Sequence, residues 1–118
     1  MGALIVAGYD ARKGGQVFGI PIGGTLREQK WAVDGSGSTY IWGLMDAEYK
    51  DGMTREEAEA FAVSSIAAAM ARDGSSGGLI RLVTINASGV THRTVQGSEI
   101  PLYHEELPHV SVTHGVAI

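Results

Sequence analysis

The chain of 118 residues contains no cysteine, which excludes a disulfide framework and a thiolate zinc site and is compatible with a reducing compartment. Basic residues are also few, with nine Lys and Arg against thirteen Asp and Glu, and the formal net charge is −4. They are scattered, whereas a nucleic-acid surface needs clustered Lys and Arg. No apolar run approaches the roughly 20 residues that span a bilayer, and the N-terminus lacks the basic segment of a signal peptide. The composition therefore predicts neither a nucleic-acid partner nor a membrane span.

Glycine, by contrast, is abundant, with seventeen copies. They stand in pairs or beside Ser and Asp, which predicts turns between ordered elements and not a disordered linker. Because 44% of the residues are hydrophobic, the chain can form one domain with a modest core.

The first half of the sequence predicts three strands and a helix, over residues 3–9, 16–20, 30–33 and 39–47. The turn "DARKGG" joins the first two strands as a hairpin. Ser36 or Ser38 is expected to cap the helix, because serine is a favourable residue before a first helical turn.

A second helix is predicted to begin at Thr54, which forms a capping box with Glu57. Its buried face is expected to follow helical spacing through Ala58, Phe61, Ala62, Ser65, Ile66, Ala69 and Met70. Gly74 stands where a left-handed C-terminal cap favours glycine. The polar residues Glu56, Glu59 and Arg72 are expected in solvent.

Residues 79–85 and 90–95 predict a second hairpin around the turn "NASG", and the chain from about Ile100 is expected to be irregular. The element order βββααββ indicates an α+β fold, an antiparallel sheet with both helices on one face. The strands at 3–9 and 79–85 are apolar on both faces, so something besides the helix pair should cover them. This pattern predicts association with another chain or with a second copy of this one.

Three groups of residues could carry chemistry. In the turn "RDGSSGG", Asp73 with Ser75 and Ser76 could orient a nucleophile or an amine, or could simply end the helix. The segment "DGSGS" at 34–38 could bind an anion with its N–H groups, although a helix cap is the better interpretation. His104, His109 and His114 recur every five residues, a spacing that favours an exposed tail over a metal site.

Other candidates are weaker, and no metal or cofactor is expected. His92 has no Ser or Asp partner nearby in sequence, so no Ser-His-Asp constellation can be argued. The aromatic residues Trp31, Tyr40 and Trp42 are expected to be core or interface anchors.

The segments "GGQVFGIPIGG", "GSGSTYIWG", "DAEYKDGMTREEA" and "ARDGSSGGLIRLVTI" resemble the C-terminal half of a proteasome core-particle β-type subunit. Within that family, the resemblance is strongest to the caspase-like catalytic subunit and its immunoproteasome counterpart. It is collinear over residues 1–103, which we therefore interpret as the half-domain, with 104–118 as an irregular tail. The resemblance implies part of an N-terminal nucleophile hydrolase fold, with two stacked sheets and a helix pair outside each.

The resemblance also implies a threonine endopeptidase of ubiquitin-linked protein degradation, in the cytoplasm and nucleus, assembled with other proteasome subunits. The family's nucleophile is an N-terminal threonine, and its position lies in the half that this chain does not match. Asp73 and Ser76 match the family's aspartate and serine that hydrogen-bond the threonine's amine, and Ser36 matches the serine that joins this network. We therefore expect the chain to be inactive alone, either as an assembly component or as half of an enzyme. A non-catalytic self-associating module and a small anion-binding domain are the alternatives.

Overall fold

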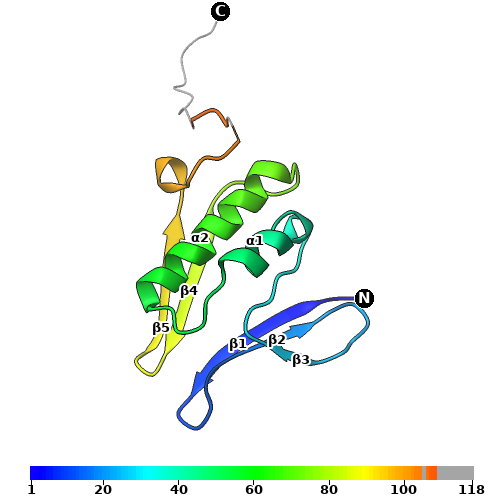
Figure 1. Ribbon diagram of the computed structural model, residues 1–118, viewed down its shortest axis with the longest axis vertical. Coiled ribbons are helices and arrows are strands. Elements are labelled where there is room, and N and C mark those ends of the chain that lie inside the picture. Colours follow the sequence, from blue (N-terminus) through cyan, green and yellow to red (C-terminus); the bar gives the residue numbers. More distant parts are fainter. Residues whose placement is uncertain (105, 109–118) are drawn as a thin grey trace, which may run out of the picture.

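A computed structural model describes residues 1–104 and 106–108, so His109 and His114 lie outside the described residues. Figure 1 shows an α+β fold in which α1 and α2 lie beside the β4–β5 hairpin, with the three-stranded sheet at the lower right of the drawing. The element order βββααββ is confirmed. The elements are β1 (Leu4–Asp10), β2 (Gly14–Ile20), β3 (Arg27–Gln29), η1 (Ser38–Tyr40), α1 (Trp42–Glu48), α2 (Arg55–Arg72), β4 (Ile80–Asn86), β5 (Gly89–Val95) and η2 (Gly97–Glu99).

The strands form two antiparallel sheets and not the single sheet that the element order predicted. One sheet has the order β1-β2-β3, with Leu4 opposite Ile20 in the first hairpin. The other is the β4–β5 hairpin, with Ile80 opposite Val95. Two sheets agree with the arrangement that the family resemblance implied. Both hairpins lie where the sequence predicted them.

The third strand was predicted at residues 30–33, and this placement is wrong. β3 is only three residues long and pairs with residues 17–19 of β2. It ends at Gln29, before the predicted segment 30–33 begins. Trp31 and Val33, instead of continuing the strand, pack against the buried cluster formed by α1 and α2. Tertiary packing therefore ends the strand early, in spite of the apolar residues that follow it.

Helix α2 begins as predicted, because the Thr54 hydroxyl accepts a hydrogen bond of 3.2 Å from the backbone N–H of Glu57. Its end differs from the prediction, since Gly74 is not in the left-handed region. The C-cap is Asp73 in an extended conformation, and its carboxylate accepts from the N–H of Ser75. The left-handed glycine of this turn is Gly78, with φ 90°.

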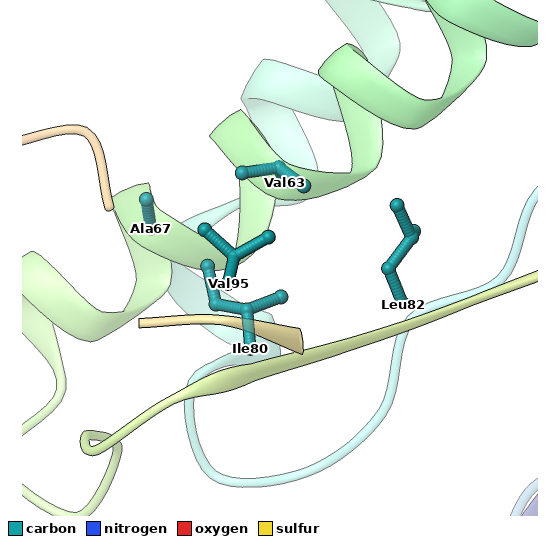
Figure 2. Close-up of a cluster of buried hydrophobic side chains, with 5 residues drawn as sticks. All are labelled: Val63, Ala67, Ile80, Leu82 and Val95. Atoms are coloured by element: carbon teal, nitrogen blue, oxygen red, sulfur yellow. The ribbon is translucent and has the colours of Figure 1, made fainter. Parts of the chain in front are cut away.

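Helix α2 packs on two neighbours with two different faces. Towards the sheet, Val63 and Ala67 contact Ile80, Leu82 and Val95, and Figure 2 shows these side chains meeting between the helix and the strands. Small residues on the helix permit this close approach.

On its other face, Ala69 of α2 joins a second buried cluster with Ile41 and Met45 of the α1 region. The predicted buried stripe is therefore correct at Ser65 and Ala69 but wrong at Ala58 and Ile66, which are exposed. The reason is that the two contact faces divide the helix surface in a way that a single apolar stripe does not represent.

Strand β1 exposes apolar side chains on both of its faces. Leu4 and Val6 point to one side and Ile5 and Tyr9 to the other, and all four are more than 40% exposed. The described residues therefore leave both faces of this strand uncovered, although the helix pair was expected to cover one of them. Strand β4 alternates at its start instead, with Ile80 and Leu82 buried and Arg81 and Val83 exposed. Among the described helices, none is long and apolar enough to cross a membrane.

Candidate functional site

The three residues selected from the sequence, Asp73, Ser76 and Ser36, lie together at the C-terminal end of α2. Asp73 is only 8% exposed. Its Oδ2 atom accepts two hydroxyl hydrogen bonds, from Ser36 at 2.6 Å and from Ser76 at 2.5 Å. Its Oδ1 atom accepts the backbone N–H of Ser75 at 3.0 Å. The carboxylate is thus fixed by three hydrogen bonds. We call Asp73, Ser36 and Ser76 the Asp73 network.

The network joins two turns that are far apart in sequence. After α2, the N–H of Ser76 donates to the backbone carbonyl of Asp73 at 3.1 Å, which folds the serine back onto the carboxylate. Ser36 comes from the turn before η1, where Gly35 has φ 93° and its N–H donates to the Asp34 carboxylate.

The predicted capping role of the two earlier serines is wrong. The residue at the N-cap of η1 is Gly37, and no side chain caps either η1 or α1. The hydroxyl of Ser38 donates to the carbonyl of Gly35, and that of Ser36 donates to Asp73. The turn therefore uses its serines to close itself and to reach α2.

Hydrogen bonding lowers the pKa of Asp73 below the ordinary value of 3.8, with the Ser36 hydroxyl as the largest cause, followed by Ser76 and the N–H of Ser75. Desolvation acts in the opposite direction and is smaller. The group is therefore an anion at neutral pH, and both hydroxyls donate to it. Such a carboxylate is a weak base, so the network is suited to hold a donor group and not to activate one of its own serines.

A pocket of about 290 Å³ lies against the network, and Ser36 and Ser76 are part of its wall. The rest of the wall is largely apolar and includes Ile41, Ile66 and Met70. A chain segment with a terminal donor group and apolar side chains would match this lining.

The other candidates do not form a site in the part of the chain that the structure describes. There, no group of three His, Asp or Glu side chains could hold a metal ion. His92 and His104 are exposed. Trp31 packs against the second cluster, and the centroid of its ring lies 5.3 Å from that of Trp42, which is exposed. Tyr40 is exposed as well.

One residue of the site was not predicted. Gly37 is buried between the two serines of "GSGS" and lies directly against Asp73 and Ser76. The only sequence signal was a glycine in a serine-rich turn, and this signal alone also fits an ordinary loop.

The family model for proteasome subunits matches residues 1–85. The chain belongs to the proteasome subunit family. It is 51% identical to proteasome subunit beta type-6 of Arabidopsis thaliana over 104 residues, which cover 88% of this chain and 45% of that protein. It is 55% identical to proteasome subunit beta type-9 of Homo sapiens over 103 residues, covering 87% of this chain and 47% of the human protein. Proteasome subunit beta type-9 of Bos taurus is 53% identical over 103 residues, with the same coverage.

These comparisons confirm the resemblance to proteasome β-type subunits. This proteasome-family chain spans slightly less than half the length of the curated relatives that it matches. Its two antiparallel sheets and helix pair agree with part of the fold that the family resemblance implied.

Proposed function

We propose that this chain forms the C-terminal half of a threonine-endopeptidase site in a proteasome β-type subunit. In this proposal, residues 1–103 supply the half-domain and residues 104–118 are a separate tail. Asp73, Ser36 and Ser76 hold the α-amine and hydroxyl of a threonine nucleophile, and that threonine is supplied by residues other than these 118. The reaction is hydrolysis of peptide bonds through the threonine hydroxyl.

The observation that carries the proposal is the convergence of three donors on the Asp73 carboxylate at the wall of a pocket. The hydroxyls of Ser36 and Ser76 both donate to the Asp73 carboxylate, so their oxygen lone pairs can accept a hydrogen bond from an incoming ammonium or hydroxyl. Charge-assisted hydrogen bonds of this kind are about twice as strong as neutral ones. They would fix the nucleophile's position, which is a large part of catalysis by an N-terminal threonine.

The proposal can be tested by combining the chain with a separate polypeptide that carries the first half of a proteasome β-type subunit. Cleavage of fluorogenic peptides should appear in the combination and should be absent for the chain alone. Asp73→Asn should lower turnover on the order of 10²-fold, since it removes the charge that holds the nucleophile in place and keeps the shape of the side chain. Asp46→Asn, at an exposed position of α1, is the matched control and should retain activity. Full turnover of the Asp73 variant would contradict the proposal.

Partners and location follow from the same proposal. The chain would assemble with other proteasome subunits, in the cytoplasm and nucleus, and would take peptides as substrate only in that assembly. The apolar faces of β1 support a partner on this sheet, because Leu4, Ile5, Val6 and Tyr9 are exposed together.

A second candidate function is a non-catalytic, self-associating module, and the exposure of β1 favours it. The discriminating measurement is sedimentation of the chain alone at tens of micromolar. A compact monomer that binds no hydrophobic dye would contradict self-association. The anion-binding alternative is disfavoured by the structure, because the charged carboxylate of Asp73, at the end of α2, accepts a hydrogen bond from Ser36 of the turn at 34–38 and would repel an anion there.

A further inference from the structure

Gly37 has an ordinary backbone conformation. Its φ of −84° and ψ of −8° lie in the right-handed helical region, which every residue type adopts easily. The need for glycine at this position therefore does not come from the backbone. It comes from space, because the residue is buried at the contact between the turn before η1 and the end of α2.

A Cβ atom on Gly37 would lie too close to three atoms. It would be 3.0 Å from Oγ of Ser76, 3.1 Å from Cβ of Ala69 and 3.2 Å from Oδ2 of Asp73. Ordinary contacts of a Cβ atom are 3.4–4 Å. Two of the three crowded atoms belong to the Asp73 network.

We infer that Gly37 is a positioning residue for the reaction proposed above. Its missing side chain lets the turn at 34–38 approach α2 closely enough for Ser36 and Ser76 to share one oxygen of Asp73. The catalytic part of this inference rests on the proposed function, whereas its geometric part can be tested separately.

A methyl group added at Gly37 would displace the network, because the one crowded atom outside it, Cβ of Ala69, cannot move away. Ala69 is buried in the second cluster, and its Cβ is fixed to the backbone of α2. The crowding must therefore be relieved by the Ser76 hydroxyl, by the Asp73 carboxylate or by the turn that carries Ser36. Any of these movements lengthens a hydrogen bond to Oδ2, and these bonds weaken steeply with distance and angle.

The test compares Gly37→Ala with Gly43→Ala in the full 118-residue chain. Gly43 is exposed on α1 and would place its Cβ in open space, so it is a matched control. The readout is the pKa of Asp73, followed by carboxyl carbon NMR during a pH titration, with circular dichroism as a check of folding. Gly37→Ala should raise the pKa of Asp73 towards its ordinary value, because hydrogen bonds to the anion are lost. Gly43→Ala should leave that pKa unchanged.

A rescue variant separates positioning from folding. Gly37→Ala combined with Ala69→Gly opens the contact on α2 and should restore both folding and the low pKa of Asp73. An unchanged pKa in Gly37→Ala would overturn the inference, as would a folded double variant without the low pKa. Failure of both variants to fold would also overturn it, since the crowding would then act on the fold as a whole.

Activity is measured separately, with the first half of a β-type subunit supplied. Gly37→Ala should lower kcat on the order of tenfold or more with little change in KM, because misplacement affects the reacting groups and not peptide binding. If the wild-type pair shows no cleavage at all, the proposed function fails while the geometric inference is still decided by the pKa of Asp73.

Discussion

The hydroxyl of Thr84 donates to Oε1 of Glu59 across 2.7 Å, and this hydrogen bond ties β4 to α2. The same oxygen accepts from Nε of Arg55 at 2.8 Å, one turn earlier on the helix. The Arg55 bond, followed by the Thr84 bond, lowers the pKa of Glu59. Glu59 was predicted in solvent, and the structure shows instead a half-buried carboxylate that links helix and strand.

We predict that Thr84→Val destabilises the chain, because it keeps the shape of the side chain and leaves Glu59 with one donor fewer. The midpoint of urea unfolding should fall while the slope m stays constant. Thr91→Val is the matched control, since Thr91 stands opposite Thr84 on β5 and is exposed. Its effect should stay within about 0.5 kcal/mol. An equal loss in both variants would mean that the hydroxyl bond to Glu59 contributes nothing.

Low pH should reduce the free energy of unfolding of the chain, in part through protonation of Asp73. Its pKa is lowered in the folded state, so ionised Asp73 contributes stability above the ordinary value of 3.8. That contribution is lost as the pH falls from about 3.8 through the lower folded pKa. Urea midpoints of Asp73→Asn should therefore depend less on pH in this range than those of the wild type. Asp46→Asn should follow the wild type, and parallel curves for all three proteins would contradict the prediction.

The two valines of β5 should differ in their effect on stability. Val95 is 5% exposed and belongs to the cluster in Figure 2, whereas Val90 is 59% exposed on the same strand. Val95→Ala removes two buried methyl groups, so it should cost about 2 kcal/mol, and Val90→Ala should cost about 0.5 kcal/mol or less. Thermal unfolding of the two variants gives the comparison. A comparable cost at Val90 would show that a partner or a second copy covers this face in solution.

The turn after α2 offers a test of its own geometry. Gly78 has φ 90°, so Gly78→Ala should destabilise by about 1 kcal/mol or more. Gly74 has no positive φ, and a Cβ there would meet open space. Gly74→Ala should therefore be neutral or stabilise by about 0.4–1 kcal/mol, since it restricts the unfolded chain. Unfolding by denaturant measures both, and the reverse order would mean that the left-handed residue is Gly74 after all.

The parts of the fold that were predicted correctly depend on short-range chemistry. The turn "NASG" places Asn86 opposite Gly89, and Thr54 caps α2 from three residues away, so both features are determined within a few residues. The end of α2 was harder because "DGSSGG" contains several glycines, and local sequence alone does not distinguish the left-handed Gly78 from Gly74.

The site could be predicted only through the family resemblance. Ser36 and Asp73 are 37 residues apart, and no periodicity of the sequence relates them. Gly37 was not predicted, because its importance depends on which atoms of another element lie beside it. Uncovered apolar surface on β1 was expected, but not its exposure on both faces, since an apolar strand pattern indicates a need for burial without identifying the element that provides it.

Because α2 packs on two neighbours, a shift of either one would be transmitted to the end of the helix. Val63 and Ala67 hold it against the β4–β5 sheet, Ala69 holds it against the α1 region, and Asp73 is fixed at its tip. A sliding of either layer along the helix axis would arrive at the tip as a displacement of the carboxylate relative to Ser36, which is anchored on a different turn. The hydrogen bonds from Ser36 and Ser76 to one oxygen of Asp73 would therefore form together only when both packing contacts of α2 are in place.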